Sequence, residues 1–558
     1  MKIKITLPDK NLSFQESVLK NRNMTMSELM RNMSSVESPD KMLNAGKAAN
    51  RIATAIQNEE KIVLYTDYDA DGFGCGVVFT ELMWKLPYKN FGVFFNTRSM
   101  GFGMNKMGID KIIQKHPDVS LIITSDNGIV SFDATEYAIS KGIDVIITDH
   151  HLPDASGNLP NAYTVVDPHQ SGETCEFQDF CGTGVIYKVI CMVYYLLCAD
   201  TKPLNDVLDI VAVATIADVV PLRGENRIFA KVGLSKMSQE CRSQWAAFKS
   251  LGSKYAPLVS FTSKDIGYFV GPCINACSRL NGDIKEPLTA FLKRMTEEQV
   301  HAAVYGLVQV NETRKEIQKC RREAAFAALE GNTDSFIVIA MDECEEGVVG
   351  LVAGDVCHKF YRPTVVLARE ENGHWKGSGR GIIGLHMKEM LDTINQKDPS
   401  ILLGYGGHAQ ACGLTVRDGK LDDFCRMAND LCAKAEISDP DLFVKKINVD
   451  YVIEDLTMLP RYYAQKVSME PYGNSFEEPV VMVVFKPDNV KVVKEGKHLI
   501  FQKDGAEIIS WNSGHLLQGR DPKTITEVRA IGTIDKSNAL NCDPDLLELT
   551  FSWDNVGL

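Results

Sequence analysis

A short acidic run, Asp67-Tyr68-Asp69-Ala70-Asp71-Gly72, is the part of this sequence best suited to bind a metal ion. It directly follows the apolar stretch KIVLYT. Two more apolar stretches, LIITSD and DVIITD, also end in aspartate, and a helical pattern ends in the motif ATIADVVPL. The candidate groups at these three ends are Asp126, Asp149, His150, His151 and Asp218.

Carboxylates and imidazoles together predict a site for Mn²⁺ or Mg²⁺, since a cluster without thiolates disfavours structural zinc. Carboxylates packed this closely repel one another unless cations neutralise them. Two divalent ions about 3.5–4 Å apart activate water and stabilise both oxygens of a displacement at phosphorus. The residue types therefore predict a phosphoesterase with two metal ions, Mn²⁺ or Mg²⁺.

Two simpler interpretations of these aspartates compete with the metal site. The run also matches the start of a calcium-binding loop, but the twelfth position is Val78 rather than Glu, and a strand precedes the run. A single Asp after a strand usually caps a turn or helix. Because aspartates recur at three strand ends, a shared metal site is favoured over three separate caps. In such a site Asp149 either binds metal or orients a histidine.

The apolar stretches that precede these residues alternate with helical patterns along the chain. KIVLYTD, FGVFF, LIITSD, DVIITD and YTVVD have the Val, Ile and Phe content of buried strands. Helical periodicity lies between and after them, for example over 74–86, 132–141, 184–197 and 204–217. This alternation predicts a parallel sheet, whose carboxyl strand ends meet at one edge.

Length and composition fit a globular, cytoplasmic protein. The chain has 558 residues, enough for roughly three or four domains. No apolar run reaches the roughly 18 residues of a membrane span, and the start, MKIKITLPDK, lacks a signal peptide's apolar centre. The 15 cysteines form no CxxC pair and fit reduced thiols. A net charge of -13 argues weakly against a nucleic-acid partner, although local basic strips still contact phosphates.

Four motifs of this chain, in order, resemble those of the DHH phosphoesterase superfamily: DYDADG, SDNG, TDHH and IADVVPL. IADVVPLRGENR and GPCINA, continuing to Arg279, are similar to RecJ-type exonucleases. The later stretches GVVGLVAG, RPTVVL, KGSGR and GGHAQACG resemble the DHH-associated substrate domain. The resemblance covers nearly the whole chain, and the motifs are specific as a set.

The resemblance implies a role for each matched residue. Metal ligands would be Asp69, Asp71, Asp126, His150 and Asp218, with Asp67 and Asp149 in or beside this set. His151 would approach the scissile phosphate. The substrate phosphate would meet Arg279, Ser378, Arg380, Gly406, Gly407 and His408. Many relatives have histidine four residues before Asp69, where this chain has Tyr65, so the first metal would use Asp67, water or a different geometry.

The expected architecture is α/β. A parallel-sheet DHH domain is joined by a long helix to a smaller α/β DHH-associated domain, and a β-rich OB-like domain follows. The expected boundaries are 1–45 for an N-terminal extension, 46–240 for the catalytic domain, 241–334 for a helical connector, 335–437 for the substrate-binding domain and 438–558 for the OB-like domain.

The implied function is hydrolysis of single-stranded DNA from an end, 5′→3′, releasing mononucleotides in repair, recombination or replication. The expected enzyme is a monomer with no membrane association, and single-strand-binding or replication proteins are candidate partners. Two alternatives remain open: a phosphodiesterase of short oligonucleotides or cyclic dinucleotides, and a non-catalytic replication scaffold.

The C-terminal segment discriminates among these functions, because OB folds bind single strands through basic grooves and stacking aromatics. Candidate groups there are Lys486, Lys491, Lys494, Lys497, Phe485, Phe501 and Trp511. A charged helix could also follow a DNA backbone through Arg314, Lys315, Lys319, Arg321 and Arg322. In the competing interpretations, the aromatic side chains fill the core of the barrel, and the charged side chains of the helix form a face exposed to solvent.

Overall fold

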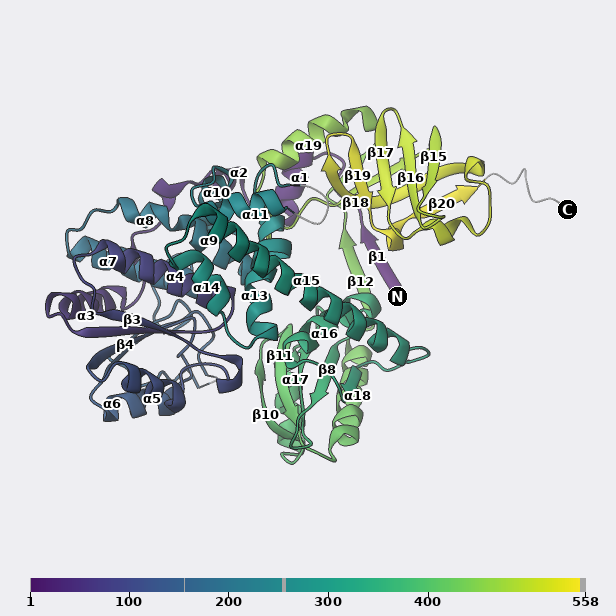
Figure 1. The fold of residues 1–558 in the computed structure, drawn as a ribbon. Coiled ribbons are helices and arrows are strands. Elements are labelled where there is room, and N and C mark those ends of the chain that lie inside the picture. The colour runs from purple at the N-terminus through teal and green to yellow at the C-terminus, as the bar shows by residue number, and fades with distance from the viewer. Residues whose placement is uncertain (1, 155, 253–256, 552–558) are drawn as a thin grey trace.

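The structure, a computed structural model, describes residues 2–154, 156–252 and 257–551. Figure 1 shows two α/β regions linked by one long helix, with a β-rich region beside them. No helix in the described residues combines the length and apolar character that crossing a membrane requires. The α/β architecture with a C-terminal β-rich region confirms the predicted fold class.

A parallel five-stranded sheet forms the centre of the first α/β domain, in the order β3-β2-β4-β5-β6. Its strands are β2 (Lys61–Thr66), β3 (Phe91–Phe95), β4 (Val119–Ser125), β5 (Asp144–Thr148) and β6 (Thr164–Val166). The strand order reverses between β2 and β4, which creates a crevice at their carboxyl ends. The acidic run follows β2 and Asp126 follows β4, so both begin at this crevice.

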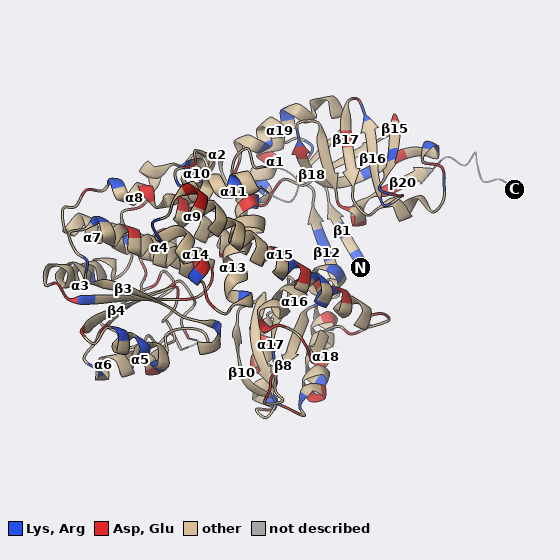
Figure 2. Ribbon diagram, viewed as in Figure 1, with Lys and Arg blue, Asp and Glu red and all other residues tan. Residues whose placement is uncertain are grey.

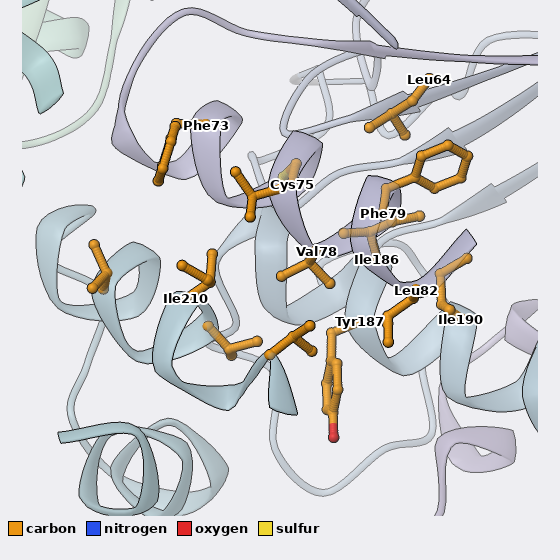
Figure 3. Packing of buried hydrophobic residues seen from close by; sticks show 14 of the residues in the cluster. Leu64, Phe73, Cys75, Val78, Phe79, Leu82, Ile186, Tyr187, Ile190 and Ile210 are labelled. Atoms are coloured by element: carbon orange, nitrogen blue, oxygen red, sulfur yellow. The ribbon is translucent and has the colours of Figure 1, made fainter. Parts of the chain in front are cut away.

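Helix α4 (Ala70–Lys85) begins inside the acidic run and is buried along most of its length. It packs against α7 (Gly182–Leu196) and α9 (Leu208–Ala217). Figure 3 shows Val78 and Leu82 of α4 in the same apolar cluster as Ile186 and Ile210. Because α4 is enclosed by apolar groups, it is a core helix that holds its N-terminal aspartates at a fixed place.

Other helices complete the first domain and lead to the second. They are α3 (Ala45–Gln57), α5 (Lys106–Lys115), α6 (Phe132–Ser140), α8 (Lys202–Asp206), α10 (Gly224–Ser238), α11 (Ser243–Leu251), α12 (Ser263–Asp265), the π-helical turn η4 (Ile266–Val270), α13 (Gly271–Leu280) and α14 (Lys285–Leu292). The helix expected over 204–217 is thus divided near Val207 into α8 and α9. The linking helix α15 (Glu297–Ala328) starts at a capping box formed by Thr296 and Gln299.

The second α/β domain has a mixed five-stranded sheet, ordered β10-β11-β9-β8-β7. Its strands are β7 (Ile337–Met341), β8 (Thr364–Arg369), β9 (Trp375–Arg380), β10 (Leu402–Gly407) and β11 (Ala411–Val416). Its helices are α16 (Glu346–Phe360), α17 (Met387–Lys397) and α18 (Leu421–Ser438). β9 pairs with β11 in an antiparallel register that places Ser378 opposite Gly413, so the KGSGR and GGHAQACG stretches lie side by side in this sheet.

The C-terminal sheet has the order β13-β14-β18-β19-β17-β16-β15, with β20 on β18. Its elements are β13 (Tyr451–Ile453), α19 (Leu459–Ser468), β14 (Val481–Phe485), β15 (Asn489–Val493), β16 (His498–Lys503), β17 (Ala506–Ser510), β18 (Ile525–Lys536), β19 (Ala539–Cys542) and β20 (Glu548–Phe551). Phe501 is fully buried in the core of this domain. Of the two interpretations open for Phe501, stacking or a barrel core, the core is confirmed, whereas Trp511 is 45% exposed.

The first residues of the chain join the C-terminal domain. β1 (Lys2–Thr6) pairs in parallel with β12 (Val444–Asn448), and α1 (Phe14–Asn21) contributes Phe14 to the C-terminal core. A buried ion pair between Arg22 and Asp450, 2.6 Å apart, fixes this contact. Blue residues mark the β1–β12 ribbon in Figure 2, where Lys4 lies opposite Lys446. The acidic protein thus carries a local basic strip.

Candidate active site

The N-terminus of α4 is built from the acidic run. Asp69 is the N-cap, and its Oδ1 accepts hydrogen bonds from the backbone N–H groups of Asp71 and Gly72, both at 3.0 Å. A Cβ at Gly72 would lie 2.3 Å from the carbonyl oxygen of Asp67, so this turn requires glycine. The Asp71 carboxylate accepts hydrogen bonds from Gly182 N at 2.6 Å and Thr183 N at 2.9 Å, at the N-terminus of α7. Helix-terminal amides thereby hold the Asp71 carboxylate in place.

His150 lies among three carboxylates from different elements. Its Nε2 is 3.1 Å from Asp126 Oδ1, 3.7 Å from Asp71 Oδ2 and 3.8 Å from Asp218 Oδ2. Asp126 adopts a left-handed backbone with φ 63, an uncommon conformation for a residue other than glycine. Gly182 allows this approach, because a Cβ there would lie 2.6 Å from Asp126 Cβ. The structure brings together these four residues from separate parts of the sequence.

Asp149 orients His151. Its Oδ1 lies 2.8 Å from His151 Nδ1, and its Oδ2 accepts a hydrogen bond from Ile129 N at 2.9 Å. Burial alone would raise the pKa of Asp149, but the charge and hydrogen bond of His151, with other contacts, lower that pKa to about 2. Burial would lower the pKa of His151, but Asp149 raises it to about 9. The pair is therefore an aspartate and an imidazolium at neutral pH.

His150 has the opposite protonation preference. Burial and the positive charge of His151 lower its pKa to about 4, despite the nearby carboxylates. Its ring is thus neutral at physiological pH, the form in which histidine binds metals.

The carboxylates of the cluster repel one another. Burial and then Asp69 raise the pKa of Asp67 to about 8. Burial, followed by neighbouring carboxylates, also raises the pKa values of Asp69, Asp126 and Asp218. Among the described residues, Asp67 Oδ1 is buried with no hydrogen-bond partner. The cluster thus combines excess buried negative charge, a free carboxylate oxygen and a neutral imidazole. A divalent cation would neutralise this charge and accept these groups as ligands.

The donor atoms are also close enough to share an ion. Single ligand atoms of Asp71, His150 and Asp218 lie within 4.8 Å of one another, and so do those of Asp126, His150 and His151. Oxygen donors predominate, which fits Mn²⁺ or Mg²⁺. Tyr65 does not join them: its ring is buried, and its hydroxyl donates to Gly103 O at 3.4 Å. Asp149, engaged with His151, has an orienting position instead.

A second group of side chains carries positive charge toward this cluster. Arg279, on α13, donates to Gly347 O at 2.9 Å, and Arg380, on β9, donates to Ser378 Oγ at 3.1 Å. Burial, followed by Arg98 and Arg314, lowers the pKa of Arg279 to about 10. No carboxylate in the described residues forms an ion pair with Arg98, Arg279 or Arg380. Guanidinium groups that lack a carboxylate partner in a partly buried site suit an anionic ligand.

The second α/β domain also supplies His408. Its ring centroid lies 6.4 Å from that of His151, with the ring planes 18° apart, so the two domains meet at the DHH motif. Gly406 and Gly407 end β10 just before it, and Gly407 has φ 137, in a region that favours glycine. A Cβ at Gly407 would lie 2.3 Å from Ala411 O, which keeps the β10–β11 turn tight. The predicted phosphate-binding residues therefore lie around one interdomain site.

Two residues near this site were not singled out from the sequence. Arg98 lies 5.0 Å over the ring of Tyr68, and Asn275 Oδ1 accepts a hydrogen bond from Ala70 N at 2.8 Å. Arg98 follows β3 at the same sheet edge as the aspartates, so the strand-end argument also applies to it. Asn275 lies in the GPCINA stretch that resembles RecJ-type exonucleases, but the sequence did not predict its contact, which joins segments that are far apart along the chain.

The basic residues of α15 do not form a free phosphate-binding face. Arg314 is buried and donates to Asn311 Oδ1 at 2.6 Å. Arg321 pairs with Glu345 at 3.2 Å, and Lys315 with Glu312 at 2.7 Å. These interactions favour the solvated or paired interpretation of the helix over a track for nucleic acid.

Comparisons with known proteins agree with this geometry. Residues 61–215 match the model described as "DHH family, N-terminal domain", and residues 333–434 match the DHHA1 domain. The chain is 32% identical over 421 residues to the single-stranded-DNA-specific exonuclease RecJ of Haemophilus influenzae, covering 73% of this chain and 72% of that protein. The Escherichia coli RecJ is 29% identical, with 85% and 83% covered.

A solved structure has the same fold. The crystal structure of Thermus thermophilus RecJ in complex with Mn²⁺ superposes with a TM-score of 0.78 at 21% identity, covering 99% of this chain and 79% of that one. The shared fold extends through the β-rich region, beyond the two matched domain models. Taken with the sequence identity to the Haemophilus protein, the chain belongs to the RecJ family of the DHH superfamily.

Proposed function

We propose that this protein is a metal-dependent exonuclease that hydrolyses single-stranded DNA. The observation that carries the proposal is the juxtaposition of two sites: a carboxylate–imidazole cluster on the first domain and unpaired arginines bridging to the second. One site suits hydrolysis of a phosphodiester, and the other suits an anionic phosphate. Relatives named single-stranded-DNA-specific exonuclease support this choice of substrate.

The metal ligands in this proposal are Asp67, Asp69, Asp71, Asp126, His150 and Asp218. Two divalent ions, Mn²⁺ or Mg²⁺, supply an activated water and charge neutralisation when bound there. Asp149 holds His151 as an imidazolium, which places a positive charge and a proton donor beside the scissile phosphate. His150 remains neutral and free to serve as a ligand.

The arginine pocket positions the substrate. Arg279, Arg380 and Ser378 would grip a phosphate of the strand, while Gly406, Gly407 and His408 close the site from the second domain. Holding one phosphate in the pocket fixes which phosphodiester meets the metal cluster, so successive cuts release mononucleotides. We assign the pocket to the 5′ end, which gives 5′→3′ polarity. We further propose that the protein acts as a monomer in the cytoplasm, in DNA repair, recombination or replication.

The test is a time course with single and double strands labelled at either end, incubated with Mn²⁺. We expect the 5′-labelled single strand to yield labelled mononucleotide from the first time points, while the duplex persists. Products that shorten from the 3′ end would contradict the polarity. Activity confined to short oligonucleotides or cyclic dinucleotides would favour the small-substrate alternative, and no metal-dependent cleavage would favour a scaffold.

Arg380 offers a specific test of the phosphate pocket. We expect Arg380→Ala to lower kcat/KM on single strands by roughly 10–100-fold, because the pocket loses one of its guanidinium groups. Arg380→Lys should recover only part of that loss, since an ammonium lacks the planar fork. Arg426→Ala is the matched control: this exposed arginine of the same domain pairs only with Asp423 in the described residues, at 2.7 Å. Equal activity of the two alanine variants would refute the pocket.

A further inference from the structure

The residue that follows Asp218 has a strained backbone. Val219 has φ 61, in the left-handed region, where a β-branched side chain is an outlier. Its side chain is 62% exposed, and it borders a cavity of about 790 Å³, so apolar packing does not hold it there. Strain of this kind persists only where surrounding contacts impose it. The contacts that impose it at Val219 therefore also set the direction of the chain at Asp218.

Val219 N donates to Ile216 O at 3.3 Å within its own segment, and further contacts to this turn come from the C-terminal domain. Asn474 lies in the segment between α19 and β14, and its Nδ2 donates a hydrogen bond to Val219 O at 2.7 Å. Its backbone oxygen accepts a hydrogen bond from Leu222 N at 2.8 Å. Asn474 thus bridges both ends of the 219–222 turn, although it lies 255 residues from Val219 in sequence.

The segment that carries Asn474 is itself anchored to the first domain. Arg227, on α10, donates to Met469 O at 2.7 Å and to Glu470 O at 3.1 Å, and also to Pro471 O. The Arg227 guanidinium lies 4.5 Å over the ring of Phe476. Ser263 Oγ donates to Tyr472 O. This dense set of contacts makes the segment a rigid support and not a loose linker.

The backbone of Asp218 is held on one side by α9, where its N–H donates to Ala214 O at 2.9 Å, and continues on the other side into the 219–222 turn. The side-chain Oδ2 of Asp218 lies 3.8 Å from His150 Nε2, beyond hydrogen-bonding distance. By contrast, Asp71 is held by two backbone amides and Asp126 lies 3.1 Å from His150. Of these three carboxylates, Asp218 is the one whose position relies most on its own backbone.

We infer that Asn474 is a positioning residue for Asp218, so that the C-terminal domain helps to build the metal site. This inference rests on the proposed function, in which Asp218 is a metal ligand. The C-terminal domain would then contribute to hydrolysis as well as to affinity. The loss of Asn474 should accordingly weaken metal binding and turnover, even for a substrate too short to reach the C-terminal sheet.

The experiment measures Mn²⁺ binding directly. For Asn474→Ala in the full-length protein, we expect calorimetry to show about three- to tenfold weaker Mn²⁺ binding, the size of one lost hydrogen bond. At saturating Mn²⁺, kcat on a short single strand should fall several-fold while KM changes little. The control is Asn489→Ala, because this asparagine of the same domain bonds only to Gln502 within its own sheet among the described residues, at 3.0 Å.

A second substitution tests the mechanism. Asparagine tolerates the left-handed conformation better than valine, so Val219→Asn should reduce the effect of Asn474→Ala on Mn²⁺ binding. If the effects of the two substitutions on the free energy of Mn²⁺ binding are not additive in a double-mutant cycle, the result supports a positioning role for Asn474. Wild-type Mn²⁺ affinity in Asn474→Ala would overturn the inference and leave the proposed function intact. If the wild-type protein bound no Mn²⁺ and cut no strand, the proposed function itself would fail.

Discussion

Replacing Asp126 by asparagine is expected to lower kcat for strand hydrolysis about a thousandfold or more, because a ligand at the centre of the cluster loses its charge. The same change should stabilise the metal-free protein above neutral pH. Burial and neighbouring carboxylates raise the pKa of Asp126 well above its usual value, so ionising it in the folded state is unfavourable. Asparagine has nearly the same shape as aspartate but no charge, so it removes the unfavourable free energy of ionising this buried side chain. Thermal melting in EDTA, alongside a nuclease assay, measures both effects.

The matched control is Asp133→Asn, on an exposed aspartate in the first turn of α6. It should change neither kcat nor metal-free stability by much, since surface substitutions away from special features have small effects. An active Asp126→Asn enzyme would refute the proposed ligand set. An inactive variant that is also strongly destabilised would instead indicate a structural role for Asp126.

Mn²⁺ is expected to stabilise the protein more strongly as the pH rises from 6 to 8. The pKa of Asp67 is raised from 3.8 to about 8, so in metal-free protein the folded state binds a proton more tightly than the unfolded state. The stability from that proton is fully present below the unfolded pKa and is lost as the pH rises toward 8. Unfolding in EDTA should therefore become easier across this window.

Mn²⁺ reverses this trend, because it binds the ionised carboxylates and replaces the proton as their neutralising charge. We expect apparent Mn²⁺ affinity to rise at least about tenfold between pH 6 and pH 8. Melting temperatures at fixed Mn²⁺ and in EDTA, compared at pH 6, 7 and 8, test this. Asp67→Asn should make the melting temperature in EDTA less dependent on pH, although Asp69, Asp126 and Asp218 still contribute. A wild-type melting temperature in EDTA that did not change with pH would contradict the assigned cause.

The contact between Asn474 and the turn after Asp218 also affects how the alternative functions can be distinguished. A phosphodiesterase for small substrates needs only the two α/β domains, whereas Asn474 ties the C-terminal domain to this turn. If the hydrogen bond from Asn474 helps to position Asp218, truncation before the C-terminal domain would impair hydrolysis of every substrate, long or short. Substrate length alone then becomes the cleaner discriminator between the two functions.

Much of the fold and site could be predicted from local sequence. The strands β2, β4 and β5 are short apolar runs, and each is followed by acidic residues, so a parallel sheet places Asp67, Asp126 and Asp149 at one edge. Arg98 follows β3 at that edge and could have been found by the same argument. Its role was missed because arginine does not resemble a metal ligand.

Where the sequence left two interpretations open, tertiary packing decided between them. Phe501 has the alternating pattern of a strand, but the pattern does not say which face meets solvent, and the ring fills the core. The basic residues of α15 have the pattern of a charged face, yet Arg314 is buried and Arg321 reaches Glu345 near the start of α16. The N-terminal 45 residues carried no sign that Lys2–Thr6 would pair with Val444–Asn448.

The sequence by itself predicted the chemistry. Residue type and strand periodicity, which are local properties, predicted a carboxylate–imidazole metal site at one edge of a parallel sheet, and the family resemblance named the candidate ligands and phosphate-binding residues. Only the tertiary structure decided the protonation states of those residues and the repulsion among their charges. The proton on His151, the neutral ring of His150 and the repulsion felt by Asp67 arise from burial and from neighbours distant in sequence. The contact between Asn474 and Val219, which joins two domains beside the carboxylate–imidazole cluster, likewise arises only in the tertiary structure.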